Sequence, residues 1–63
     1  MRINKEKLRI VMARKCVNAG DLVRATGMPR PTVSKALSGQ SISTKTIGLI
    51  SAALDVDVTE IIE

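Results

Sequence analysis

The stretch NAGDLVRATGMPRPTVSKALSG, residues 18–39, decides the fold of this chain. Its spacing predicts two short helices joined by a tight turn, with the first helix ending at Gly27. The polar side of the second helix carries Arg30, Thr32, Ser34 and Lys35. Two helices held at a fixed angle can place the second one in the major groove of DNA, where the edges of the bases can be read.

One recurring spacing predicts five helices. An apolar residue is followed five positions later by another, as in a hydrophobic staple across the start of a helix. The pairs are Ile3 with Leu8, Val17 with Leu22, Met28 with Val33, Ile42 with Ile47, and Val56 with Ile61. Four of the starts carry a favoured N-cap residue, namely Asn4, Asn18, Ser43 and Asp57. We expect helices at residues 5–15, 19–26, 31–38, 44–54 and 58–62, with Arg30 capping the third and Pro31 beginning it.

The apolar positions follow helical spacing and predict one compact all-α domain over residues 1–63. Cys16 is expected to pack as a small apolar residue, and Ile10 to be exposed. The expected core consists of Leu8, Val11, Met12, Val17, Leu22, Val23, Ala25, Met28, Val33, Ala36, Leu37, Ile47, Ile50, Ala53, Leu54 and Ile61.

Composition excludes several classes of protein. There is no histidine and only one cysteine, so no internal disulfide can form and the commonest general base and metal ligand are missing. We therefore expect no enzyme, no metal and no cofactor. No apolar run is long enough to span a membrane, and no secretory signal is present, which predicts a cytoplasmic location. The absence of aromatic residues disfavours stacking on single-stranded bases.

Charge is distributed unevenly along the chain. Residues 1–39 contain nine Lys or Arg and two acids, a balance of +7, whereas residues 40–63 contain one Lys and four acids, a balance of −3. A basic half of this kind suits a polyanionic partner, although composition alone is equally compatible with a solubilising surface.

Two segments together resemble the Cro and phage-repressor type of helix-turn-helix domain, also called the xenobiotic-response-element (XRE) family of lambda-repressor-like domains. They are DLVRATGMPRPTVSKALSG, residues 21–39, and TIGLISAALDVDVTEII, residues 46–62. The resemblance covers about residues 3–62. It implies a five-helix all-α fold with the helix-turn-helix at helices 2 and 3, and binding to operator DNA as a homodimer.

The resemblance also implies roles for individual residues. Positions that face bases correspond to Arg30, Pro31, Ser34 and Lys35. Positions that contact the DNA backbone correspond to Asn18, Ala19, Ser41, Ser43 and Lys45, and Thr32 is added as a phosphate or thymine-methyl contact. Dimer contacts are placed at Val58 and Ile62. Arg30 has the best chemistry for base contact, because a guanidinium can pair with guanine O6 and N7; the alternative is a solvated surface arginine.

The chain departs from the family pattern at several positions. Met12 and Leu37 stand where many members have a buried Arg–Glu pair, a replacement that leaves the fold intact. Other members often have glycine where Cys16 and Asp55 stand, to close a helix in the left-handed conformation. Pro31 and Ala19 lack the polar side chains that would bond to a base or a phosphate.

The function predicted from the sequence is sequence-specific binding of double-stranded DNA by a small transcriptional repressor of phage or mobile-element type at palindromic operators. The alternative is a protein-interaction module on the same scaffold, such as an antirepressor or an antitoxin-like partner, or the DNA-binding fragment of a larger regulator. The basic half with Arg30 and Lys35 favours DNA as the partner, whereas the lack of polar side chains at Pro31 and Ala19 favours a protein partner.

Overall fold

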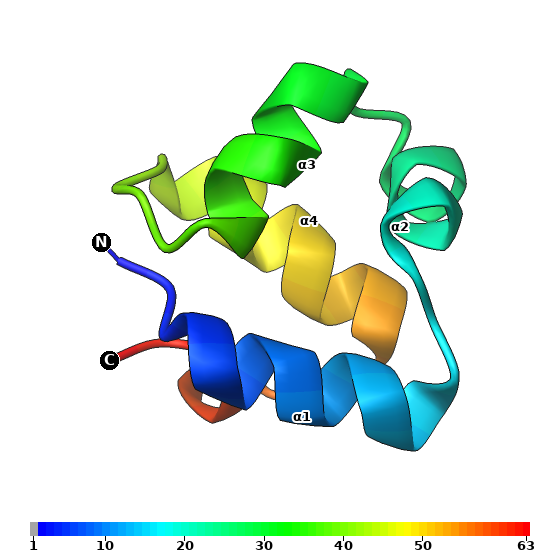
Figure 1. The fold of residues 1–63 in the computed structure, drawn as a ribbon. Helices are drawn as coiled ribbons and strands as arrows, with labels where there is room; N and C mark the ends of the chain where they lie inside the picture. The colour runs from blue at the N-terminus through cyan, green and yellow to red at the C-terminus, as the bar shows by residue number, and fades with distance from the viewer. Residues whose placement is uncertain (1) are drawn as a thin grey trace.

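The computed structural model describes residues 2–63 and is helical throughout (Figure 1). The helices are α1 (Lys5–Lys15), α2 (Ala19–Thr26), α3 (Arg30–Leu37) and α4 (Thr44–Leu54), followed by a 3₁₀ helix, η1 (Val58–Glu60). The predicted all-α fold is confirmed. The predicted fifth helix at 58–62 is not, because the chain leaves helical geometry at Ile61 and then pairs Ile62 with Ile3 in a β-bridge.

The four predicted N-caps with a favoured side chain are all present. The side chain of Asn4 accepts hydrogen bonds from the backbone N–H groups of Glu6 and Lys7, both at 3.1 Å. The equivalent bonds run from Asp21 N–H to Asn18 at 2.8 Å, from Thr46 N–H to Ser43 at 3.2 Å, and from Thr59 N–H to Asp57 at 2.9 Å. Each satisfies a backbone donor that has no partner within its own helix.

Helix α3 begins one residue earlier than predicted. Pro29, not Arg30, is the N-cap, and Pro31 is the second helical residue. The backbone explains this, because the Pro29 carbonyl accepts from Thr32 N–H at 3.1 Å and from Val33 N–H at 3.3 Å. Pro29 offers no capping side chain, so α3 starts without a side-chain cap.

The core agrees with the predicted one except that it lacks two of the predicted residues and also contains Ile3. Leu8, Leu22, Ile47, Ile50 and Ile61 are among the fully buried residues, together with others of the predicted set and Ile3. Partly buried members pack around them, including Val17, Val23, Leu37 and Ala53. The predictions for Ala25 and Cys16 were wrong, since both are exposed. Cys16 ends α1 in the left-handed conformation, which turns it out of the core.

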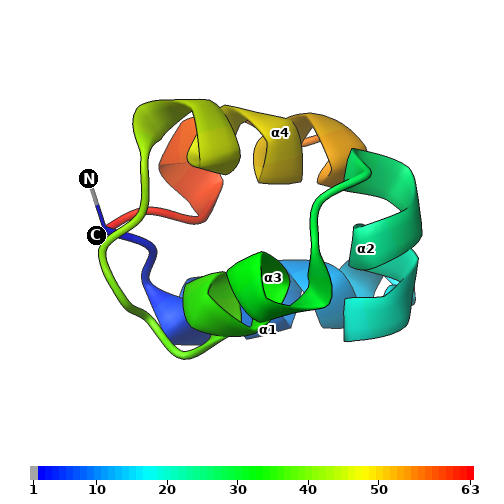
Figure 2. The same ribbon diagram turned by 90° about the horizontal axis from the view of Figure 1, so that it is seen from above.

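The packing leaves one side of α3 without a neighbouring helix. Among the described residues α3 packs on α1 and α2, while α4 packs on α1, α2 and η1 (Figure 2). The described ends of the chain lie side by side, as both views show, and an isolated bridge between Ile3 and Ile62 joins them. A second bridge joins Arg2 to Ser41 in the α3–α4 loop.

Candidate nucleic-acid interface

Helix α3 has one buried and one exposed face. Val33 and Ala36 are buried and Leu37 is half-buried, so this side is directed into the core. The opposite face follows the helical repeat and is exposed; its residues are Arg30, Pro31, Ser34 and Lys35. The structure therefore brings the four predicted base-facing residues together on one outward surface, while Thr32 is half-buried at its margin. Their roles toward DNA stay predictions.

The turn before α3 fixes the angle between α2 and α3. Gly27 ends α2 with φ of 72°, a left-handed conformation that suits glycine, and its N–H bonds to the Val23 carbonyl at 3.0 Å. The hydroxyl of Thr26 donates to the Leu22 carbonyl at 2.6 Å and accepts from Met28 N–H at 3.3 Å. Buried Met28 then anchors the turn to the core, and α3 packs on α1 and α2.

The start of α2 carries a complete capping box. Asn18 accepts from Asp21 N–H, and the Asp21 carboxylate accepts from Asn18 N–H at 3.0 Å. The bond from Asn18 N–H holds the pKa of Asp21 below its ordinary value, and the Arg24 guanidinium lowers the pKa further. The side chain of Asn18 is thus engaged within the helix. The first backbone N–H groups of a helix, here those at Ala19 and Gly20, have no intrahelical partner and can meet a phosphate.

The α3–α4 loop contributes the remaining predicted backbone contacts. Ser41, Ser43 and Lys45 are all exposed. The hydroxyl of Ser43 caps α4 and lies 2.9 Å from the hydroxyl of Thr46, so it is already engaged within the protein. Lys45 is the second residue of α4, at the end of that helix nearest the loop, which places its charge beside the start of the helix.

The predicted dimer residues lie at the other side of the fold. Val58 and Ile62 are half-buried and pack against the protein's own core, so only part of each is open to a second subunit. Their role in a dimer stays a prediction. Ile10 is 61% exposed, which confirms the expectation for that residue.

Gly20 and Arg24 lie beside the predicted interface, and neither was predicted from the sequence to contact DNA. Arg24 pairs with Asp21 on α2, and its guanidinium comes close to Gly20, as does that of Arg30. The spacing of Asp21 and Arg24, three positions apart on one helix, could have indicated their ion pair. No local pattern indicates the approach of Arg30 to Gly20, because it joins two helices.

Residues 2–63 contain no cluster of His, Cys, Asp and Glu that could hold a metal ion. Over the same residues, no helix combines the length and the apolar character needed to cross a membrane.

A family model described as a Cro/C1-type HTH DNA-binding domain covers residues 7–63. No curated protein and no solved structure matches the chain.

Proposed function

We propose, from the premise that this chain belongs to the family of Cro/C1-type helix-turn-helix DNA-binding domains, that it recognises particular duplex sequences and represses transcription. The observation that carries the proposal is the outward face of α3, where Arg30, Ser34 and Lys35 lie exposed beside one another. A helix with this surface fits the major groove, and its basic and hydroxyl groups match the acceptors on base edges.

The mechanism divides between attraction and selection. Lys and Arg of the basic half supply salt-sensitive attraction to phosphates, which positions the domain on the duplex. The DNA backbone is contacted at three places. These are the start of α2 at Asn18 and Ala19, Thr32 of α3, and the loop with Ser41, Ser43 and Lys45. Arg30, Ser34 and Lys35 then select the sequence, while Pro31 offers only an apolar contact.

The finer part of the proposal concerns assembly and origin. Two copies pair through Val58 and Ile62, which sets two recognition helices about 34 Å apart on a palindromic operator. The chain acts in the cytoplasm as a repressor of phage or mobile-element type, without catalytic activity.

Selection of bound fragments from random double-stranded DNA, followed by titration of the preferred duplex, tests the function. Replacing Arg30 and Lys35 together by alanine should weaken binding to that duplex by at least about tenfold, because each good base contact discriminates by about 1–3 kcal/mol. Both side chains are exposed, so the melting temperature should stay close to that of the wild type.

The matched control removes one positive charge elsewhere. Lys15 lies beside Arg14, Asp55 and Glu60 on the α1–η1 side, and Lys15→Ala should retain the preference for the selected duplex. Equal affinity of the wild type for every duplex would defeat the proposal. It would favour a protein-interaction module on this scaffold, the alternative that Pro31 and Ala19 support.

A further inference from the structure

Two guanidinium groups from different helices converge on Gly20, in the first turn of α2. A β-carbon built on Gly20 would lie 3.7 Å from Nη1 of Arg24 and 3.7 Å from Nη2 of Arg30. It would also lie 3.3 Å from Oδ1 of Asn18, the atom that caps the helix. The surface above Gly20 is therefore occupied by the tips of two arginines, one from α2 and one from the start of α3.

The two arginines differ in how they are held. Arg24 forms an ion pair with Asp21, whose other carboxylate oxygen accepts from Asn18 N–H at 3.0 Å, so Arg24 is tied to its own helix. Among the described residues, the ion pairs are this one and Arg14 with Glu60, and Arg30 takes part in neither. No carboxylate thus directs the guanidinium of Arg30. Its position depends on the shape of the surface on which it lies.

We propose that Gly20 is a positioning residue for Arg30. By presenting no side chain, Gly20 leaves room for the guanidinium at the front of α3 to lie against the first turn of α2, and this determines which base edges Arg30 meets. The inference rests on the proposed function, because it assumes that Arg30 contacts DNA. It deepens that function by assigning part of the sequence preference to a residue that itself carries no recognition group.

The effect of a larger residue follows from these distances. The β-carbon alone would be in tight contact with Asn18 Oδ1 and in ordinary contact with both guanidinium groups, so a longer side chain competes with these groups for the space above Gly20. Arg24 is tied by its ion pair, and Arg30 is the group that moves. Glycine is also a poor helix former, so a leucine at this position does not weaken α2 through its backbone preference.

Gly48 provides a matched control within the same chain. It too lies inside a helix, α4, but a β-carbon there would have nothing within 4 Å. Gly20→Leu and Gly48→Leu therefore make the same chemical change, and only the first fills the space used by Arg30. Circular dichroism melting verifies that both variants fold, and Gly20→Met provides a second bulky variant at position 20.

The experiment measures base preference rather than overall affinity. The duplex preferred by the wild type is selected from random DNA, and relative affinities are measured for every single-base substitution in it. Arg30→Ala should reduce the preference at certain base pairs by about tenfold. Gly20→Leu should reduce it at the same base pairs, and the double variant should resemble Arg30→Ala alone. Gly48→Leu should keep the wild-type profile.

The outcomes separate the two proposals. If Arg30→Ala alters the profile while Gly20→Leu and Gly20→Met leave it unchanged, Gly20 has no positioning role and the proposed function stands. If Arg30→Ala leaves the profile unchanged, base contact by Arg30 is refuted, and the role of Gly20 falls with it. A change caused equally by Gly48→Leu would also overturn the inference, because it would show an effect of helical glycine replacement in general.

Discussion

At the scale of single residues, two helix ends have a geometry that usually belongs to glycine. Cys16 closes α1 with φ of 56° and ψ of 44°, and Asp55 closes α4 with φ of 56° and ψ of 47°. The family pattern predicts a left-handed residue at both positions, and the structure confirms it. In this conformation Cβ approaches the following carbonyl oxygen, which costs about 1–2 kcal/mol for a residue other than glycine.

Cys16→Gly and Asp55→Gly should each stabilise the protein. Relief of the left-handed strain outweighs the extra freedom that glycine gives the unfolded chain, which leaves a net gain of about 0.5–1 kcal/mol in the free energy of unfolding. Urea denaturation measures it. Gly27→Ala is the reverse change at φ of 72°, and should destabilise by about 1 kcal/mol although its β-carbon would meet nothing within 4 Å. If Cys16→Gly and Asp55→Gly both lowered the free energy of unfolding, the strain argument would be contradicted.

For single residues, the sequence predicts the backbone conformation better than it predicts burial or contacts with other helices. The apolar character of Cys16 indicates burial, but Cys16 ends α1 in the left-handed conformation and is exposed. Ala25 fits a helical stripe yet is exposed, whereas Leu22 of the same helix is buried. The approach of Arg30 to Gly20 joins two helices, so no local spacing indicates it.

At the scale of elements, the helix starts were predictable because capping is local. A cap and the backbone N–H that it satisfies lie two or three residues apart, so both are visible in the sequence. Two cases were missed. Helix α3 starts without a capping side chain and begins one residue earlier than predicted, and η1 ends where Ile62 pairs with Ile3 at the far end of the chain. A contact between residues this distant leaves no local pattern.

Asn18→Ala should affect both stability and DNA binding. Loss of the capping box at α2 should reduce the free energy of unfolding by about 1 kcal/mol. It should also weaken duplex binding, because the first turn of α2 presents the backbone N–H groups proposed to meet a phosphate.

Asn4→Ala is the comparison for Asn18→Ala. It removes the cap of α1 and should cost similar stability, with little change in affinity for DNA. Thermal melts and duplex titrations of both variants suffice. Equal weakening of DNA binding by the two variants would remove the special role of the α2 start.

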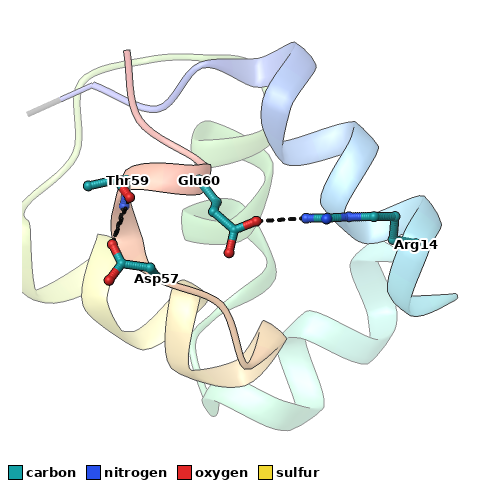
Figure 3. A network of polar contacts seen from close by, with 4 residues as sticks. All are labelled: Arg14, Asp57, Thr59 and Glu60. Carbon is teal, nitrogen blue, oxygen red and sulfur yellow. Dashed lines mark hydrogen bonds and ion pairs between the residues drawn. The ribbon is translucent and has the colours of Figure 1, made fainter.

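At the scale of the whole molecule, long-range contacts hold the ends of the chain together. Asn4 N–H donates to the Ile61 carbonyl at 2.9 Å, and Glu63 N–H donates to the Arg2 carbonyl at 3.2 Å. Arg14 of α1 pairs with Glu60 of η1 at 2.9 Å, close to the bonds between Asp57 and Thr59 (Figure 3). These contacts tie α1 to η1 and so hold the support on which α2 and α3 are mounted.

Because carboxylates take part in these contacts, we expect the protein to lose stability in acid. The pKa of Asp57 is lowered by the bonds from the N–H and hydroxyl of Thr59, and that of Glu60 is lowered by the bond from Arg14. Asp21 has a lowered pKa as well. Groups with depressed folded pKa values stabilise the protein fully above their unfolded values, about 4. That contribution is lost as the pH falls through the lower folded values.

When the pH is lowered from 6 to 2, the melting temperature of the wild type should therefore decrease once the pH is below about 4. The melting temperature of Glu60→Gln should decrease less over this range than that of the wild type, because one of the three carboxylates no longer titrates. Wild-type stability that is unchanged down to the lowest pH would show that these bonds do not favour the charged forms.

The uneven charge of the whole molecule predicts how salt affects DNA binding. If a dimer makes roughly six phosphate contacts, the logarithm of the affinity should fall with a slope near −5 against the logarithm of the salt concentration.

Lys45 lies at the start of α4 next to the loop, whereas Lys15 lies beside Asp55 at the other end of that helix. Lys45→Gln should make the slope shallower by about 1 for each copy of the chain, and Lys15→Gln should leave it unchanged. Titrations of one duplex at several salt concentrations distinguish the two variants. Equal slopes for the two variants would mean that Lys45 at the start of α4 does not contact the DNA backbone.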